Sequence, residues 1–117
     1  MFSVTDVPRL WHVSVTVGGD ANSVTETHAA LNRLQVERPF LDSLRYDEHR
    51  AELSYWEEGA TIVDAASLAL RLWDEHRFTV GLPAWKVLGL EVLERDVYHA
   101  RQVAEPLVAV DSAPRRF

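Results

Sequence analysis

The chain has 117 residues, enough for one domain with a hydrophobic core but not for two domains. Its composition, 47% hydrophobic and 26% charged, is that of an ordinary globular protein and excludes wholesale disorder. Twelve Lys and Arg against eighteen Asp and Glu give a net charge of −6, and because the basic residues are scattered, we expect no nucleic-acid partner.

The sequence contains no cysteine, which excludes disulfides, thiolate metal sites, Fe–S clusters and cysteine nucleophiles. The histidines show no spacing typical of metal ligands, so we expect no metal site and no cofactor. No apolar run approaches the roughly 18 residues of a membrane-spanning helix, and the N-terminus does not resemble a signal peptide. We therefore expect a cytoplasmic protein without membrane association.

The first half of the chain predicts a strand, a helix and a hairpin. Residues 10–17 alternate between apolar and more polar side chains, which is typical of a half-buried strand. Ser23 and Glu26 form a capping box that predicts a helix over about 22–35. Two runs rich in Leu, Tyr and Trp, residues 41–47 and 51–57, then predict a hairpin.

The second half predicts a helix and a fourth strand. Thr61 and Asp64 form a second capping box, and good helix formers continue to about Arg77. Gly81 and Pro83 end that helix. Residues 85–94 then predict a strand whose Leu88, Leu90 and Val92 lie on the face covered by the helices.

The element order βαββαβ predicts an α+β fold. Right-handed crossovers are satisfied by a four-stranded antiparallel sheet, in the order fourth, first, third, second, with both helices on one face. We assign residues 1–103 to this ferredoxin-like plait and 104–117 to a C-terminal tail. The β-prone run 106–110 would dock on an edge of its own sheet or be exchanged with a second copy, and residues 111–117 look like a loose end.

The sheet face without helices collects the first candidate site. On it we expect His12 to lie beside Trp56 and near Glu91, where a carboxylate would orient the imidazole for acid–base catalysis. The alternative is a surface that packs on a partner or is solvated. The full set expected on this face is His12, Ser14, Thr16, Arg45, Glu52, Ser54, Trp56, Val87, Gly89, Glu91 and Leu93.

A second candidate site precedes the first helix. Backbone N–H groups of Gly18, Gly19 and Asp20 could hold a carboxylate or phosphate there, with Ser14 and Trp56 as further ligand-binding candidates. We favour a permissive strand-to-helix turn as the role of the glycines. The second helix is apolar over more than half its circumference, so either the tail or another protein chain should cover it.

This order of elements resembles the ferredoxin-like superfamily over about residues 8–96. Within it, the segment from Gly18 to Asp20 is similar to the loop of ACT-like regulatory domains, which bind amino acids at dimer interfaces. The chain also resembles dimeric α+β-barrel proteins, which pair plaits through the open face and exchange a C-terminal segment. It also resembles a small uncharacterised protein family.

Three functions remain open at this level. We favour a non-enzymatic interaction or assembly module that forms a homodimer, with a heterologous protein as the other partner to consider. The second is an ACT-like domain that binds a small ligand near Gly19 and Asp20. The third is a cofactor-free enzyme of the α+β-barrel type with His12 and Glu91 as its acid–base pair.

Overall fold

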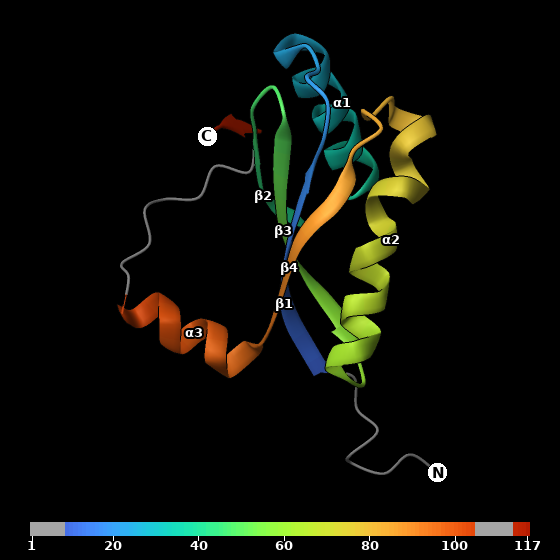
Figure 1. Cartoon of the computed structure of the whole chain (residues 1–117). Helices are drawn as coiled ribbons and strands as arrows, with labels where there is room; N and C mark the ends of the chain where they lie inside the picture. The colour runs from blue at the N-terminus through green and yellow to red at the C-terminus, as the bar shows by residue number, and fades with distance from the viewer. Residues whose placement is uncertain (1–8, 105–113) are drawn as a thin grey trace.

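The computed structural model describes residues 9–104 and 114–117, so the predicted strand at 106–110 lies outside the described residues. Three helices and five strands follow one another in the chain (Figure 1). They are β1 (Arg9–Gly18), α1 (Val24–Glu37), β2 (Leu41–Tyr46), β3 (Arg50–Gly59), α2 (Ile62–Val80), β4 (Lys86–Glu94), α3 (Arg95–Ala104) and β5 (Arg115–Arg116).

The strands form one mixed sheet in the order β4-β1-β3-β2-β5. The first four pair in antiparallel fashion in the predicted order, and the α+β class is confirmed. The predicted four-stranded sheet with two helices is not matched in two respects. β5 adds to β2 in parallel, and α3 lies on the sheet face that was expected to be open (Figure 1).

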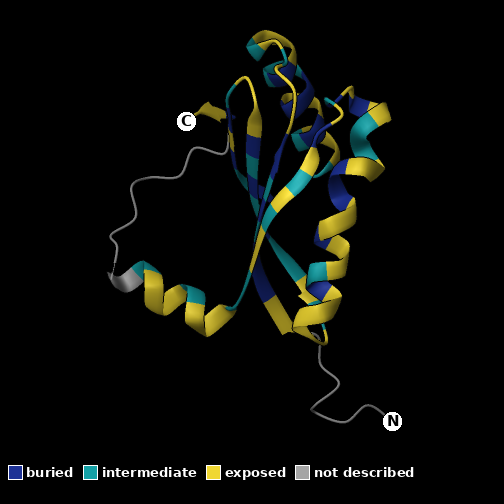
Figure 2. Ribbon diagram, viewed as in Figure 1, coloured by how far each residue is buried: buried dark blue, intermediate teal, exposed yellow. Residues whose placement is uncertain are grey.

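The core lies between the sheet and the helices α1 and α2. Val13, Val15 and Val17 point to this side because alternate residues of a strand face alternate sides, and all three are buried. They meet Leu31 and Leu34 of α1 in one apolar cluster. Figure 2 shows that burial follows the sheet-facing sides of both helices. The predicted apolar side of β1 therefore builds the core.

A β-bulge in β4 changes which side chains face the core. The β1–β4 register shifts between Thr16 and Val17, so one extra residue, Leu88, lies between Val87 and Gly89. Val87 packs against the core and Leu88 is largely exposed. The prediction that Leu88 faces the helices and Val87 the open face was wrong, because uninterrupted alternation does not account for the extra residue.

Caps fix the ends of the long helices. The Ser23 hydroxyl accepts a hydrogen bond from the Glu26 N–H, and Thr61 accepts one from Asp64, as the capping boxes predicted. The second helix continues past Arg77 to Val80. It ends at Gly81, whose backbone is left-handed, and the N–H groups of Gly81 and Leu82 both donate to the Arg77 carbonyl.

The C-terminal residues are not a loose end, contrary to the prediction. Arg115 and Arg116 pair with Arg45 and Tyr46 of β2, and the Phe117 N–H donates to the Tyr46 carbonyl. This strand is only two residues long and has no apolar alternation, so the sequence carries no local signal for it. β5 covers the β2 edge of the sheet, which leaves β4 as the other edge.

The left-handed backbone at Gly81 generates a stability prediction. Gly81→Ala should lower the free energy of unfolding by about 1–2 kcal/mol, because a Cβ is strained at φ 78°. Gly59→Ala is the matched control, since the added Cβ would lie 3.5 Å from its nearest neighbours, an ordinary contact. Urea unfolding compares the two variants, and equal stabilities would contradict the role given to Gly81.

Candidate functional site

The helix α3 packs across the sheet face opposite α1 and α2, where it contacts β1 and β4 (Figure 1). Its Tyr98 stacks on the His12 ring, with centroids 3.9 Å apart and planes at 26°. His12 is only 7% exposed as a result. The face that the sequence predicted to be open is therefore partly roofed by the chain itself.

Four rings form an aromatic cluster between α3 and the sheet. It consists of His12, Trp56, Tyr98 and His99. His12 pairs with Trp56 across β1 and β3, as predicted, and their ring centroids lie 5.1 Å apart. Trp56 also contacts both α3 rings, with centroids 4.9 Å from Tyr98 and 5.8 Å from His99. Such edge and stacked contacts each add about 0.5–1.5 kcal/mol beyond area burial.

Asp42 is the carboxylate that approaches His12. Its Oδ2 lies 3.7 Å from the His12 Nε2, and its Oδ1 is buried without a hydrogen-bond partner among the described residues. A register shift between Leu41 and Ser43 places Asp42 at an irregularity of β2. Burial raises the pKa of the Tyr98 hydroxyl, and the negative charge of Asp42 adds to that rise.

Sequence reasoning missed both Asp42 and Tyr98. The irregularity in β2 cannot be read from a regular strand pattern, and the segment after Glu94 carries only a short helical signal. A pair of adjacent aromatic rings, Tyr98 and His99, was the one local hint that this helix docks on something.

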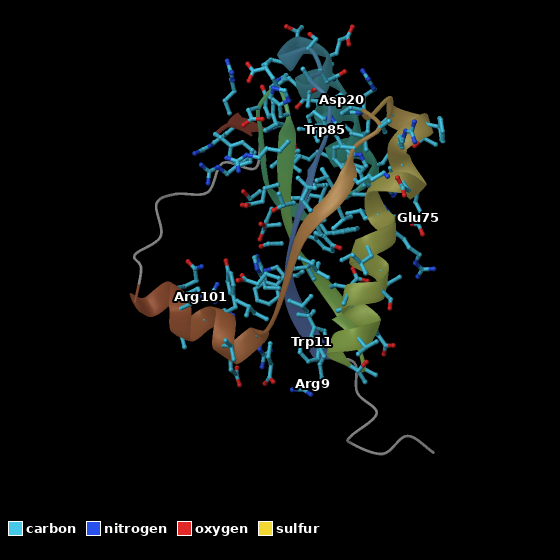
Figure 3. All side chains as sticks on the ribbon, in the orientation of Figure 1. Arg9, Trp11, Asp20, Glu75, Trp85 and Arg101 are labelled. Carbon is cyan, nitrogen blue, oxygen red and sulfur yellow. The ribbon has the colours of Figure 1, made fainter. Side chains whose placement is uncertain are left out.

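Glu91 has a different partner from the one predicted. The register places it opposite Ser14, whereas His12 lies opposite Leu93. Its Oε1 accepts a hydrogen bond from the Arg101 guanidinium of α3 at 3.0 Å. Figure 3 labels Arg101 on that helix. The sheet and α3 are thus joined by an ion pair as well as by the aromatic cluster.

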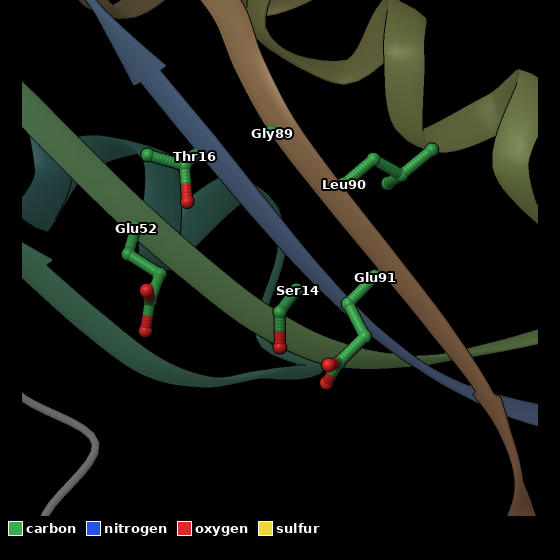
Figure 4. A pocket seen from close by; sticks show the side chains of 6 residues that line it. All are labelled: Ser14, Thr16, Glu52, Gly89, Leu90 and Glu91. Carbon is green, nitrogen blue, oxygen red and sulfur yellow. The ribbon is translucent and has the colours of Figure 1, made fainter.

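An open hollow of about 290 Å³ lies on the same sheet face as the aromatic cluster (Figure 4). Its lining residues are Ser14, Thr16, Glu52, Gly89, Leu90 and Glu91. Two of these, Ser14 and Glu91, were predicted as site residues, whereas His12 and Trp56 do not line the hollow. The Ser14 hydroxyl lies 3.1 Å from that of Ser54, within hydrogen-bond distance.

The segment from Gly18 to Asp20 lies at the far end of β1, where Gly18 is buried and Gly19 and Asp20 are exposed. The Gly19 N–H donates to the His49 carbonyl at 2.9 Å, and the Trp85 indole donates to the Asp20 carbonyl at 2.8 Å (Figure 3). A Cβ on Gly18 would lie 2.8 Å from the His49 carbonyl oxygen. Close packing therefore explains the glycines, and the Gly19 N–H already has an acceptor.

A third surface consists of the β4 edge and the flank of α2 beside it. It exposes four apolar side chains, and we call it the β4 edge surface. Its members are Val63 and Leu70 of α2, Leu90, which extends away from the side of Ser14 and Thr16, and Leu88, whose side chain lies next to Gly18. The tail was one of the two covers predicted for the apolar circumference of α2. Residues 9–104 and 114–117 do not show this cover, because Val63 and Leu70 are 67% and 49% exposed.

Two further observations concern ligands and membranes. Within residues 9–104 and 114–117, no three His, Asp or Glu side chains come together in a way that could hold a metal ion. None of the helices in this part of the chain combines the length and apolar character required to cross a bilayer.

Comparisons with known proteins give one match. Residues 10–108 match the model of a family described as a domain of unknown function (DUF8830), a range that includes all three surfaces described above. No curated protein matches the sequence.

The packing of Gly19 against Trp85 generates the second prediction. In Gly19→Ala the new Cβ would lie 2.9 Å from the Trp85 ring, which is itself buried and stacked on Trp73. The free energy of unfolding should fall by about 1–3 kcal/mol. Asp20→Ala keeps the backbone acceptor and should change it by less than about 0.5 kcal/mol. Thermal and urea unfolding distinguish the variants, and a neutral Gly19→Ala would contradict this packing.

The stacking of Tyr98 generates the third prediction. Tyr98→Ala should lower the free energy of unfolding by about 1–3 kcal/mol and release α3, because a helix of ten residues is marginal without tertiary contacts. Hydrogen exchange at the α3 amides should accelerate. Val97→Ala, at an exposed position of the same helix, is the control. Unchanged protection of α3 in Tyr98→Ala would show that the stacking does not hold the helix.

Proposed function

Because the chain belongs to the DUF8830 family, whose function is unknown, its surfaces are the guide to its role, and we propose that it is a non-enzymatic assembly module that forms a homodimer. The two copies meet along the β4 edge surface. The observation that carries this proposal is a sheet edge left open with exposed leucines beside it, while the opposite edge is covered.

The strand order supports membership of the ferredoxin-like superfamily as part of this proposal. Strands β4, β1, β3 and β2 have the order and antiparallel pairing of a plait, and α1 and α2 lie on one face. α3 and β5 are then additions to it. Small domains of this kind bury one sheet face under their own helices, and an edge strand that nothing covers presents unpaired backbone groups to another strand.

The two sheet edges differ in their protection. β2 is covered by β5, whose two arginines are exposed. β4 pairs with β1 on one side and, within the described part of the chain, with no strand on the other. It contains no proline, and Leu88 is 66% exposed. An unprotected edge with exposed leucines is a template for pairing with another strand.

The flank of α2 extends this surface beyond the edge. Val63 and Leu70 lie seven residues apart and so share one side of the helix. Leu70 lies one turn before Trp73, which stacks on Trp85 next to the start of β4. A strand or helix that docked at the β4 edge would therefore meet apolar side chains on the helix layer as well.

A second copy of the chain is the occupant that fits. A two-fold axis gives both copies the same surface, so an apolar edge meets an apolar edge. Antiparallel pairing of two β4 strands about Leu90 places Gly89 of each copy opposite Glu91 of the other. This register avoids the repulsion that would arise if the two Glu91 carboxylates lay directly opposite each other.

The solution mass tests this proposal. Light scattering over a wide concentration range should give a dimer for the wild type and a monomer for Leu88→Lys/Leu90→Lys, because a buried unpaired lysine opposes association. Val36→Lys is the matched control, since Val36 is exposed on α1, which packs on β2 and α2 but not on β4. This variant should remain a dimer.

A wild-type monomer at every concentration would overturn the homodimer, and a dimer that survives the double substitution would move the interface elsewhere. A chain truncated before Pro106 distinguishes a β4 interface from an exchanged C-terminal tail. It loses β5 and should be less stable, but it should still dimerise if β4 forms the interface. Loss of the dimer in a folded truncated chain would favour tail exchange.

A further inference from the structure

The hollow lies on the sheet face that carries α3 and shares Leu90 of β4 with the proposed dimer surface. From its lining we infer that it binds a small organic cation carrying an ammonium group. Its volume of about 290 Å³ lies just below the roughly 300–1,000 Å³ of small-molecule pockets, which suits a small ligand. In Figure 4 the side chains of Ser14, Thr16, Glu52 and Glu91 extend to the same side of the sheet, while Leu90 extends away from it.

Gly89 keeps the hollow open. Among the described residues only Gly81 has a left-handed backbone, so the conformation at position 89 does not require glycine. A Cβ there would lie 3.7 Å from the Thr16 Cβ, an ordinary contact, so the fold has room for a side chain. Glycine inside a strand is unfavourable and is typical of places where something approaches the backbone closely.

The charge of the hollow is negative. Arg45 lies opposite Glu52 in the sheet, but its guanidinium lies over the Phe117 ring, 5.1 Å from the centroid. Glu52 has no ion-pair or hydrogen-bond partner among the described residues. Glu91 is paired with Arg101. One carboxylate is therefore available at the wall of the hollow, and the other is partly neutralised.

These groups suit an ammonium better than a metal ion or an anion. The hydroxyls of Ser14 and Thr16 and the Glu52 carboxylate supply acceptors for the three N–H donors of an ammonium. Calcium requires about six to eight oxygen ligands, more than this lining offers. An anion would meet two glutamates. The volume exceeds that of a bare ammonium, so the cation carries a short organic chain.

Isothermal titration with 1,4-diaminobutane tests this inference, with 1,4-butanediol as the neutral probe of equal length. The wild type should bind the diamine saturably, with weaker affinity at higher salt, and should not bind the diol. Glu52→Gln should lower the affinity by about tenfold or more, because a charge-assisted hydrogen bond is lost.

Gly89→Ala and Gly89→Val fill the hollow and should weaken or abolish diamine binding while the melting temperature is retained. Gly89→Ala keeps the test valid if valine proves too large for the fold. Gly59→Ala, outside the hollow, should bind like the wild type. The inference is overturned if the wild type does not bind the diamine saturably, if the diol binds equally well, or if folded Glu52→Gln and Gly89→Ala bind unchanged. Titration and light scattering are separate measurements, so a failure of diamine binding is distinguished from a failure of the homodimer.

Discussion

Pairing of β1 with strands on both sides is the constraint on which the rest of the structure depends. β1 lies between β3 and β4 and pairs with both along most of its length. Its alternation sends valines into the core and His12, Ser14 and Thr16 to the opposite face. A shift of one residue would exchange these sets and bury the polar side chains. Both the core and the face that carries the hollow are therefore fixed by this register.

The second face of the sheet is divided between two kinds of surface. α3 covers one part through the aromatic cluster and the ion pair between Glu91 and Arg101. The neighbouring part remains open as the hollow, where Gly89 contributes no side chain. Contacts between aromatic rings close the part under α3, whereas the hollow is lined largely by small and acidic side chains and stays open. This contrast separates the packing role of His12 from the ligand-binding role that we infer for Ser14 and Thr16.

The edges of the sheet show a similar contrast. At β2, the last residues of the chain add a strand, and Arg116 forms an ion pair with Glu48 at 2.8 Å. At β4, leucines lie beside the open side of the strand. Covering one edge leaves the other as the place where a sheet can grow, which connects the fold to the assembly role that we propose.

The sequence by itself determined the local elements of this protein. Alternation identified β1, capping boxes identified the starts of α1 and α2, and the handedness of crossovers led to the order of the first four strands, because each of these signals acts over a few residues or one crossover. Tertiary structure alone decided the bulge at Leu88, the approach of Asp42 to His12, the docking of α3 and the pairing of β5. These features depend on contacts between residues far apart in the chain, and the pattern of neighbouring residues does not reveal the energies of such contacts.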